Sequence, residues 1–573
     1  MKNWRFGLLV GIVFFCFLGI IFRLFTLQIL KHNSYQIKAA NQQQGYQNIY
    51  PSRGEIYMQD RYVEKKSISS FFPVAINKNF YKVYAIPKNI LAKEETANLL
   101  APLLNIDLAT IRNRINKQDD PYEPLKDKVD ETIIEQIKNL NLEGINFETQ
   151  SRRYFPLNAI ACHLIGFVRE QEGEQDKGQY GIEESYQKEL AGKTGLALME
   201  KDSRGQFIPV TKEIIEKPED GVDLVLTIDS NIQIFAEQKL QEYIDKFKST
   251  SGSIVIMEVK TGKILTMVNS PKFNPNNYSD VKNVSVFMNQ AVQSLYEPGS
   301  VFKPITMAAA LDKGVVTPQT TYNDIGKVEI SGKIIENALK RGEGIQTMTE
   351  VLEKSLNTGV VFAQQKLGKS DFKNYIEKFG FSEKTGIDLN GEVRGNTANL
   401  ETNRDFEFAN ISFGQGIAVT PIQLVAAFGA LANDGILMRP YVVDKIIYSN
   451  GKEKITQPTE IRRVISSNTA SRITAMLVSV VKNGHTQRAG VSGYQVAAKT
   501  GTAQIPDPTT KRYLENETIH TVMGYFPAFD ARFSMIVKLD KPIGARFAES
   551  TSAPLFGEIA KYILNYYEIA PSE

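Results

Sequence analysis

A charge-free run of apolar residues near the N-terminus constrains most strongly how this chain can fold. It extends from residue 6 to residue 22 and consists of Leu, Ile, Val, Phe, Gly and one Cys, and after Arg23 a mostly apolar stretch continues it to residue 30. A run of roughly 17 apolar residues reaches the lower limit for crossing a bilayer, where a helix satisfies its own backbone hydrogen bonds. A cleaved signal peptide is the alternative, but no small-x-small cleavage site follows the run. The sequence therefore predicts an uncleaved transmembrane helix.

The charges beside this run predict its orientation. Lys2 and Arg5 precede it, and basic residues favour the cytoplasmic side of a membrane helix. Arg23 and Lys31 at the other end weaken this signal. We expect residues 1–30 to form a cytoplasmic tip and a single anchor in the inner (cytoplasmic) membrane, with the rest of the chain on the periplasmic or extracytoplasmic side.

Composition excludes several classes of function. The 573 residues include 67 basic and 64 acidic side chains, a net charge of +3, which gives no reason to expect a nucleic-acid partner. Cys16 lies in the apolar run and Cys162 far outside it, so no disulfide framework is expected. The four histidines lack metal-ligand spacing. The sequence predicts no metal ion and no cofactor.

Two blocks follow the apolar run. Residues 31–215 mix helix and strand signals, including an amphipathic helical stretch at 90–117, and residues 216–221 are charged and turn-prone. The second block, 222–573, begins with strand-like segments, and Asp229-Ser230 is expected to cap a helix at about 231–247. A helical middle follows, with helical stretches at 421–433 and 467–483, before the strands return and a closing amphipathic helix ends the block. This order predicts one antiparallel sheet made from both ends of the block with helices packed against it, an α+β fold. The strand-like segments lie at 222–228, 253–259, 263–268, 495–498, 521–526 and 532–539.

Ser300 and Lys303 are the first candidates for chemistry. They lie in the sequence EPGSVFKP at 297–304, where Pro and Gly predict a turn, and the largely apolar residues 305–311 predict a buried helix. Ser300 is then expected at the helix start, with Lys303 one turn later on the same face. A desolvated amine can activate a serine hydroxyl, and a helix N-terminus stabilises developing negative charge. Ser-x-x-Lys alone is common by chance, and an ordinary helix surface is its default interpretation.

Ser355 and Asn357 form a second pair, in Ser355-Leu356-Asn357 after a helical stretch. A hydroxyl and a carboxamide two residues apart can contact one substrate from a short loop. A helix cap or a turn is the ordinary explanation for such a pair.

A third motif, Lys499-Thr500-Gly501-Thr502, directly follows the strand-like residues 494–498. Lys-Thr-Gly also occurs at 193–195 and 384–386, but only Lys499 is expected to terminate a strand. A strand edge with glycine and hydroxyl side chains lets backbone N–H groups reach a substrate lying alongside. Context therefore favours the third copy.

In this order, the three motifs resemble those of penicillin-binding proteins and related β-lactamases. The chain resembles class B penicillin-binding proteins, the monofunctional D,D-transpeptidases of cell-wall synthesis, over nearly its whole length. RGEI at 53–56 looks like the start of the family's pedestal, and FGQG at 413–416 is similar to a catalytic-domain signature. The resemblance implies an elongated, non-catalytic α+β pedestal (dimerisation-like) domain at 31–215 and a penicillin-binding, serine β-lactamase-like transpeptidase domain at 222–573.

Two features depart from the family pattern. DRYV at 60–63 is shifted and lacks the glycine of the family's usual turn, and His485 stands where a threonine is common. Neither departure touches the three motifs, so they bear on the subfamily more than on activity.

The resemblance implies how the nucleophile works. Ser300 attacks the carbonyl of a terminal D-Ala-D-Ala bond, and neutral Lys303 takes its proton. The N–H groups of Ser300 and Thr502 form the oxyanion hole. An amine of a neighbouring stem peptide then attacks the acyl-enzyme, and β-lactams are expected to acylate Ser300 and to leave slowly.

The other motif residues are implied to hold the substrate. Ser355 relays a proton toward the leaving D-Ala, and Asn357 binds the substrate amide. Lys499, Thr500 and Thr502 bind the terminal carboxylate by charge and hydrogen bonds, with Gly501 in the same substrate-binding edge.

Several alternatives share these motifs. Water as the acceptor would give a D,D-carboxypeptidase, and efficient deacylation or a signalling module would give a β-lactamase or a β-lactam sensor. A non-enzymatic scaffold is the alternative outside enzymes. Within class B, length and a compact pedestal favour the division (FtsI-like) type over the elongation type. Either type would pair, through anchor and pedestal, with a polytopic glycan-polymerising protein of the shape-elongation-division-sporulation class.

Overall fold

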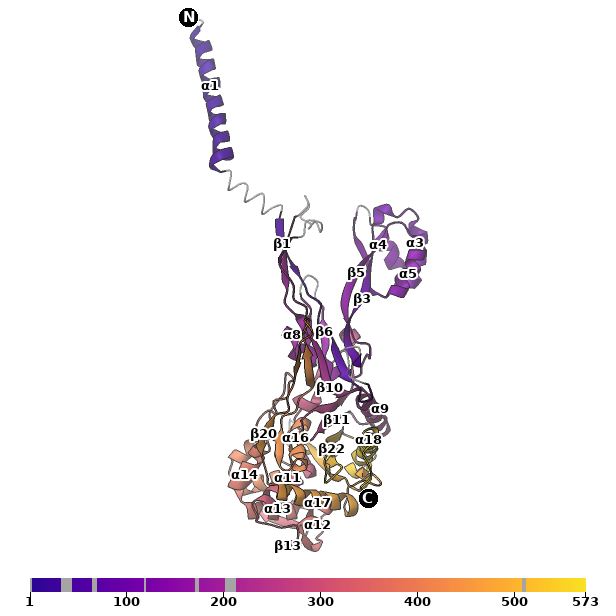
Figure 1. Cartoon of the computed structure of the whole chain (residues 1–573), viewed down its shortest axis with the longest axis vertical. Coiled ribbons are helices and arrows are strands. Elements are labelled where there is room, and N and C mark those ends of the chain that lie inside the picture. Colours follow the sequence, from indigo (N-terminus) through magenta and orange to yellow (C-terminus); the bar gives the residue numbers. More distant parts are fainter. Residues whose placement is uncertain are drawn as a thin grey trace. The chain divides into compact units, whose positions relative to one another are not determined.

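The computed structural model describes residues 3–31, 44–63, 70–117, 120–170, 175–200, 213–507 and 512–572. They form two compact units (Figure 1). The first unit comprises Met1–Arg53 and Ala191–Gly221, and the second comprises Gly54–Leu190 and Val222–Glu573.

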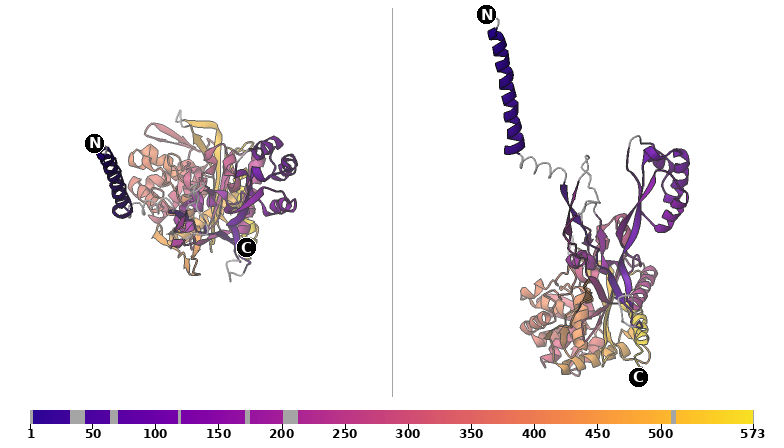
Figure 2. Two further views of the ribbon diagram at one scale, coloured as in Figure 1. Left: turned by 90° about the horizontal axis from the view of Figure 1, so that it is seen from above. Right: turned by 45° about the horizontal axis from the view of Figure 1, so that its top comes forward.

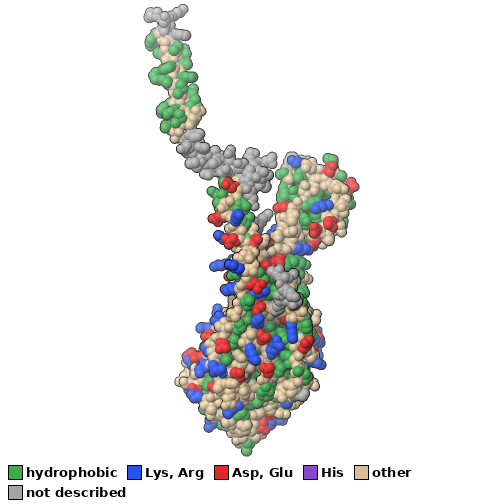
Figure 3. Space-filling model, in the orientation of Figure 1, with side chains coloured by type: hydrophobic (Ala, Val, Ile, Leu, Met, Phe, Trp, Pro, Cys, Tyr) green, Lys and Arg blue, Asp and Glu red, His purple; other side chains and the backbone are tan. Residues whose placement is uncertain are grey.

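The first unit contains the predicted apolar helix. Helix α1 (Asn3–Phe25) continues into η1 (Thr26–Leu30), and Gly7–Leu30 is the one helix among the described residues that is long and apolar enough to cross a membrane. Its side chains form an apolar surface (Figure 3), as the hydrocarbon region of a bilayer requires. This helix fits a single-pass membrane protein. The unit also holds a three-stranded antiparallel sheet of β1 (Gln44–Ile49), β8 (Gly195–Glu200) and β9 (Glu213–Glu216).

The second unit begins with a seven-stranded sheet that joins distant parts of the sequence. Its order is β19-β18-β10-β2-β3-β4, with β5 also paired to β3. The strands are β2 (Ile56–Gln59), β3 (Phe72–Ala85), β4 (Glu123–Val129), β5 (Ile145–Tyr154), β10 (Asp223–Asp229), β18 (Val443–Ile447) and β19 (Glu453–Ile455). Strand β10 pairs in parallel with β2 and antiparallel with β18. A strand is therefore present at the expected residues 222–228. Our prediction that this strand joins the antiparallel sheet made from both ends of the second block is wrong.

The helical stretch expected at 90–117 is two helices, α3 (Lys93–Leu104) and α4 (Leu108–Ile115). Asn105 ends α3 in the left-handed conformation with φ 49°, and the Asp107 side chain accepts a hydrogen bond from Thr110 N at 2.8 Å to cap α4. With α5 (Glu131–Asn139) they pack beside β3 and β4 around a core of their own (Figure 2).

A five-stranded antiparallel sheet forms the centre of the remaining chain, in the order β12-β11-β23-β22-β21. Its strands are β11 (Ser251–Glu258), β12 (Ile264–Ser270), β21 (Ala497–Pro506), β22 (Tyr513–Phe526) and β23 (Phe533–Asp540). The predicted antiparallel sheet made from both ends of the second block is thus confirmed. Strand β21 lies at one edge, which leaves one side of its backbone free for other contacts.

Helices cover both faces of this sheet. On one face, α9 (Ser230–Phe247) and α18 (Ser552–Tyr566) pack on alternate residues of the strands, whereas the buried helix α16 (Pro421–Ala432) contacts the other face. The Asp229 carboxylate caps α9 by accepting hydrogen bonds from Asn231 N and Ile232 N at 3.0 and 3.1 Å. The predicted cap and the predicted closing helix are both confirmed.

The helical middle surrounds α11 (Lys303–Asp312), whose residues from Lys303 to Leu311 are all buried. A helix that is apolar on every side belongs inside a protein, and the other helices enclose it. Its neighbours are α12 (Met348–Glu353), α13 (Asn357–Leu367), α14 (Lys369–Lys378) and α17 (Ser467–Asn483), and α15 (Asp405–Ser412) packs on α13. Two small strand pairs precede α12: β13 (Thr321–Asp324) with β16 (Gly344–Thr347), and β14 (Lys327–Ile330) with β15 (Lys333–Glu336).

The short elements that remain connect these parts. They are α6 (Cys162–Ile165), α7 (Gly181–Ser185), α8 (Gln187–Ala191), α10 (Gln290–Gln293), β6 (Phe167–Arg169), β7 (Lys177–Gln179), β17 (Ile436–Met438), β20 (Glu460–Arg463) and the 3₁₀ turns η3 (Pro87–Asn89), η5 (Pro275–Asp280), η6 (Val284–Phe287), η7 (Gly299–Phe302), η8 (Ala398–Glu401), η9 (Gln487–Ala489) and η10 (Ala548–Ser550).

Candidate active site

Ser300 lies in η7, the turn that leads into α11. Gly299 adopts φ 59°, which glycine reaches without strain, and the buried side chains of Val301 and Phe302 hold the turn in the core. The regular α-helix begins at Lys303, so Ser300 stands one turn before it rather than inside it. The side chain of Ser300 is half-buried, as a nucleophile that must meet a substrate requires.

Lys303 is fully buried, and its amine contacts the second motif. Lys303 Nζ donates hydrogen bonds to Ser355 O at 2.5 Å and to Ser355 Oγ at 3.2 Å. Burial, followed by the like charge of Lys499, lowers the pKa of Lys303 well below its ordinary value. Among the described residues, the amine hydrogen-bonds Ser355 and not Ser300. A neutral amine in this position can accept a proton from a nearby hydroxyl.

Ser355 occupies the short connection between α12 and α13. Its φ of 56° is left-handed, which costs a residue with a Cβ atom about 1–2 kcal/mol. Such strain persists only where surrounding contacts fix the backbone, and it is frequent at active sites. Asn357 begins α13, and its Nδ2 donates to Glu336 O at 2.9 Å.

The third motif lies within edge strand β21, not at its end. The strand begins at Ala497 and runs to Pro506, so our expectation that Lys499 terminates a strand is wrong. Pairing with β22 carries the strand through Gly501, because the backbone groups that face β22 find partners regardless of local propensity. The expected position at a sheet edge is nevertheless confirmed.

Lys499 is 1 % exposed, and burial lowers its pKa to about 7. Lys499 Nζ donates to Thr500 O at 3.0 Å. The hydroxyl of Thr500 shares a hydrogen bond with that of Thr486 at 3.2 Å, and Thr502 Oγ1 accepts one from Ala548 N at 3.1 Å. Burial favours the neutral form of both lysines, and the charge of Lys499 further favours the neutral form of Lys303.

Gly501 lets β21 approach η7 closely. A Cβ atom at Gly501 would lie 3.0 Å from Pro298 O, 3.0 Å from Val301 Cγ1 and 3.1 Å from Val301 N. These distances are shorter than ordinary contacts, so a side chain would force the strand away from the turn that carries Ser300. The first and third motifs are therefore neighbours. The second motif contacts the first through the hydrogen bonds between Ser355 and Lys303.

The two other Lys-Thr-Gly copies have structural contacts. At 193–195, Lys193 pairs with Glu219 through the backbone and an exposed ion pair, and Gly195 begins β8. At 384–386, Thr385 N, Thr385 Oγ1 and Gly386 N all donate to the carboxylate of Glu392. Neither copy contacts the three motifs through these bonds.

Glu297, which sequence reasoning did not single out, holds the loop beside Ser300. Its carboxylate accepts hydrogen bonds from Gly416 N and from Tyr513 OH, both at 2.9 Å, and burial raises its pKa. Gly299 N also donates to Gly414 O at 3.0 Å. The FGQG signature at 413–416 thus packs against the turn that carries Ser300. No spacing rule would have found Glu297, because its partners lie more than a hundred residues away.

Comparisons with known proteins agree with this geometry. The family described as "Penicillin binding protein transpeptidase domain" matches residues 252–561, and "Penicillin-binding Protein dimerisation domain" matches residues 48–226. Stage V sporulation protein D of Bacillus subtilis (strain 168) is 34% identical over 528 residues, which cover 91% of this chain and 79% of that protein. Peptidoglycan D,D-transpeptidase FtsI of Escherichia coli (strain K12) is 30% identical over 578 residues, covering 99% and 93%.

Solved structures share the fold. The crystal structure of penicillin-binding protein 2X from Streptococcus thermophilus superimposes with a TM-score of 0.77 at 23% identity and covers 92% of this chain and 81% of that chain. The fold that carries the matched dimerisation and transpeptidase domains is therefore shared with this solved structure. With an anchoring helix, a dimerisation domain and a transpeptidase domain in one chain, the protein belongs to the class B penicillin-binding proteins.

Proposed function

We propose that the protein is a peptidoglycan D,D-transpeptidase that crosslinks stem peptides through a serine acyl-enzyme. The contact of buried Lys303 Nζ with Ser355 Oγ, one turn from Ser300, carries this proposal, because it supplies both a neutral base and a path for its proton. The family relationship and the relative named peptidoglycan D,D-transpeptidase support the same reaction.

The first half-reaction forms the acyl-enzyme. Ser300 Oγ bonds to the carbonyl carbon of the penultimate D-Ala, and its proton moves to Lys303 Nζ. The N–H groups of Ser300 and Thr502 stabilise the oxyanion; losing such a donor typically costs about 10²–10³ in rate. As the peptide C–N bond breaks, Ser355 Oγ passes the proton from Lys303 to the leaving amine of D-Ala.

Substrate binding uses the remaining motif residues. Lys499, Thr500 and Thr502 bind the terminal carboxylate at the edge of β21, where Gly501 keeps the backbone close. Asn357 binds the amide of the donor peptide. In the second half-reaction an acceptor amine attacks the ester carbonyl and loses a proton to Lys303, which returns that proton to Ser300 Oγ as the ester bond breaks. β-Lactams acylate the same serine.

Acceptor preference separates this proposal from hydrolytic alternatives. The purified protein is incubated with a peptide donor ending in D-Ala-D-Ala, with and without an acceptor amine, and products are followed by mass spectrometry. We expect release of D-Ala together with a crosslinked product when the acceptor is present. Hydrolysed donor alone, at any acceptor concentration, would instead indicate a carboxypeptidase.

We further propose where the protein works. Helix α1 anchors the chain in the inner membrane with its N-terminus cytoplasmic, residues 31–215 form the pedestal, and residues 222–573 form the transpeptidase domain outside the cytoplasm. Lys2 and Arg5 support this orientation. Protease added to spheroplasts should remove everything beyond the anchor; protection of the transpeptidase domain would refute the orientation.

Division is the proposed setting, with a polytopic glycan polymerase as partner. The FtsI relative, which aligns over 93% of its length, supports the FtsI-like type. A fluorescent fusion should localise to the septum and co-purify with a polymerase through the anchor. Even labelling of the side wall would favour the elongation type instead.

A further inference from the structure

We propose that Asp324 is a positioning residue that holds the Ser355-Leu356-Asn357 motif in place through Asn337 and Thr358. This inference rests on the proposed function. Asp324, at the end of β13, is 2 % exposed, and its carboxylate is the hub of a hydrogen-bond network behind the motif. None of these three residues belongs to the motifs that identified the site.

The start of α13 lacks a cap from its own sequence. Leu356 occupies the N-cap position and offers no side-chain hydrogen bond, whereas most helices begin with a polar cap that satisfies the first N–H groups. Asn337 replaces this cap from a distance: its Oδ1 accepts a hydrogen bond from Thr358 N at 3.2 Å. The helix that begins with Asn357 is therefore held at Thr358 by a residue 21 positions earlier in the sequence.

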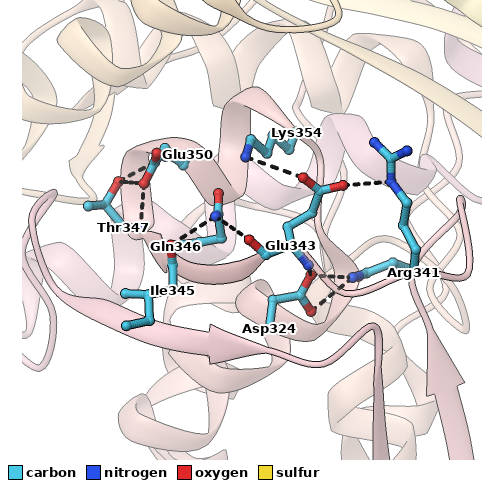
Figure 4. Close-up of polar contacts among 9 residues, drawn as sticks. Asp324, Arg341, Glu343, Ile345, Gln346, Thr347, Glu350 and Lys354 are labelled. Carbon is cyan, nitrogen blue, oxygen red and sulfur yellow. Dashed lines mark hydrogen bonds and ion pairs between the residues drawn. The ribbon is translucent and has the colours of Figure 1, made fainter.

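Asp324 in turn fixes both Asn337 and Thr358. Asn337 Nδ2 donates to both carboxylate oxygens at 3.0 Å, and Thr358 Oγ1 donates to Asp324 Oδ1 at 2.7 Å. The same carboxylate accepts a hydrogen bond from Gly326 N at 3.1 Å. It also accepts one from Glu343 N at 3.0 Å, which closes the loop between β13 and β16 (Figure 4). A carboxylate that accepts this many bonds cannot shift without breaking several of them.

The network reaches the motif at further points. Glu336, next to Asn337, accepts the side-chain hydrogen bond of Asn357 through its carbonyl at 2.9 Å. On the other side of Ser355, Lys354 Nζ lies 3.4 Å from Glu343 Oε2, and Glu343 also pairs with Arg341 at 2.8 Å (Figure 4). The strained backbone of Ser355 is thus flanked on both sides by residues tied to the β13–β16 segment.

A displacement of this motif would affect the reaction, because Ser355 contacts the amine of Lys303 and Asn357 faces the substrate in the proposed mechanism. A displacement of about 1 Å in a catalytic group can cost about 100-fold in rate. Loss of the Asp324 network should therefore slow acylation while the serine and both lysines remain intact.

The test measures acylation by a labelled penicillin, separating non-covalent binding from the first-order acylation step. Asp324→Asn replaces one accepting oxygen by an NH₂ group that faces donors. Thr358→Val removes the hydroxyl at nearly constant shape, and Thr358→Ser restores it. We expect Asp324→Asn and Thr358→Val to lower the acylation rate constant by about 10- to 100-fold. Binding should change little, the count of reactive sites should stay unchanged, and Thr358→Ser should stay within a few-fold of the wild type.

Asp388→Asn is the matched control. Asp388 also accepts backbone hydrogen bonds, from Val442 N at 2.7 Å and Val443 N at 3.0 Å, together with one from Tyr186 OH at 3.0 Å, but it contacts none of the three motifs through them. Its substitution should lower thermal stability and leave the acylation rate constant unchanged.

The outcomes are distinguishable. Wild-type acylation rates in folded Asp324→Asn and Thr358→Val, or equal slowing by Asp388→Asn, would overturn the positioning role alone. Absence of labelling in the wild type would overturn the proposed function and this inference with it. If Asp324→Asn does not fold, the comparison of Thr358→Val with Thr358→Ser decides.

Discussion

At the scale of single residues, the site contains buried and strained residues that lower the stability of the fold. Among the residues that the structure describes, no carboxylate is a hydrogen-bond partner of the buried Lys303 or Lys499, and Ser355 is held in a left-handed conformation. Burial disfavours the charged form of each lysine and lowers its pKa. In the proposed mechanism, burial of the lysines provides a neutral base, and the strained backbone of Ser355 fixes the position of its hydroxyl.

Lys499 should make stability depend on pH. Its pKa is about 7 in the fold and about 10.5 in the unfolded chain, so only the unfolded chain binds this proton between these values. Wild-type stability should therefore rise with pH across this window, by at most about 1.4 kcal/mol per pH unit from this group. Lys499→Met, which lacks the group, should be more stable than the wild type near pH 7, with a gain that fades toward pH 10. Urea unfolding followed by circular dichroism at pH 7.5, 8.5 and 9.5 measures this; a constant difference would contradict it.

Two substitutions of Ser355 separate the effect of its backbone strain on stability from the effect of its hydroxyl on acylation. Ser355→Gly and Ser355→Ala both remove the hydroxyl that contacts Lys303, so both should acylate slowly. Only glycine adopts φ 56° without strain, and Ser355→Gly should therefore be more stable than Ser355→Ala by about 1 kcal/mol. Thermal unfolding of the pair gives the comparison. Equal stabilities would show that the backbone relaxes when the side chain is lost.

At the scale of elements, the close approach of β21 and η7 sets the geometry of the site. Gly501→Ala adds a Cβ atom about 3 Å from Pro298 O and Val301 N, where neither backbone atom can yield easily. Strand β21 and the N–H group of Thr502 should move away from Ser300.

We expect Gly501→Ala to lower the acylation rate by about 10²-fold, similar to the loss of an oxyanion donor. Gln504→Ala, at an exposed position on the same strand, should leave the rate unchanged. Stopped-flow fluorescence with a labelled penicillin compares the two. A Gly501→Ala protein with the wild-type rate would mean that the strand and the turn adjust independently.

Elements with local signals could be predicted closely from the sequence. Helix α17 occupies the expected residues 467–483, and Ser466 caps it through a hydrogen bond from Thr469 N. Helix α16 begins at the expected Pro421 because Thr420 and Gln423 form a capping box. Each of these ends is set by residues within one turn.

Elements that depend on distant partners could not be predicted in this way. The strand at 222–228 has the right pattern, but its pairing with β2 and β18 depends on residues more than 150 positions away. The three motifs could be recognised because their residue types and order are specific. Asp324, Asn337 and Thr358 could not, because a buried polar network is visible only once the chain is folded.

At the scale of the whole molecule, the fold brings together three motifs spread over two hundred residues. The proposed nucleophile lies on a turn before a buried helix, the proposed base contacts the loop between two further helices, and the proposed carboxylate-binding edge belongs to a strand from the C-terminal part. On the face shown in Figure 3, acidic and basic side chains are interspersed over the body, in keeping with the small net charge. Recognition therefore depends on the local site rather than on a long-range field.

The central claim is that Ser300 carries the acyl group. The most direct measurement is peptide mapping by mass spectrometry of the protein after reaction with a labelled penicillin, with Ser300→Ala in parallel. The account predicts one label, on the peptide that contains Ser300, and none on Ser300→Ala. A label that remains on Ser300→Ala, or that maps to another residue of the wild type, would contradict it.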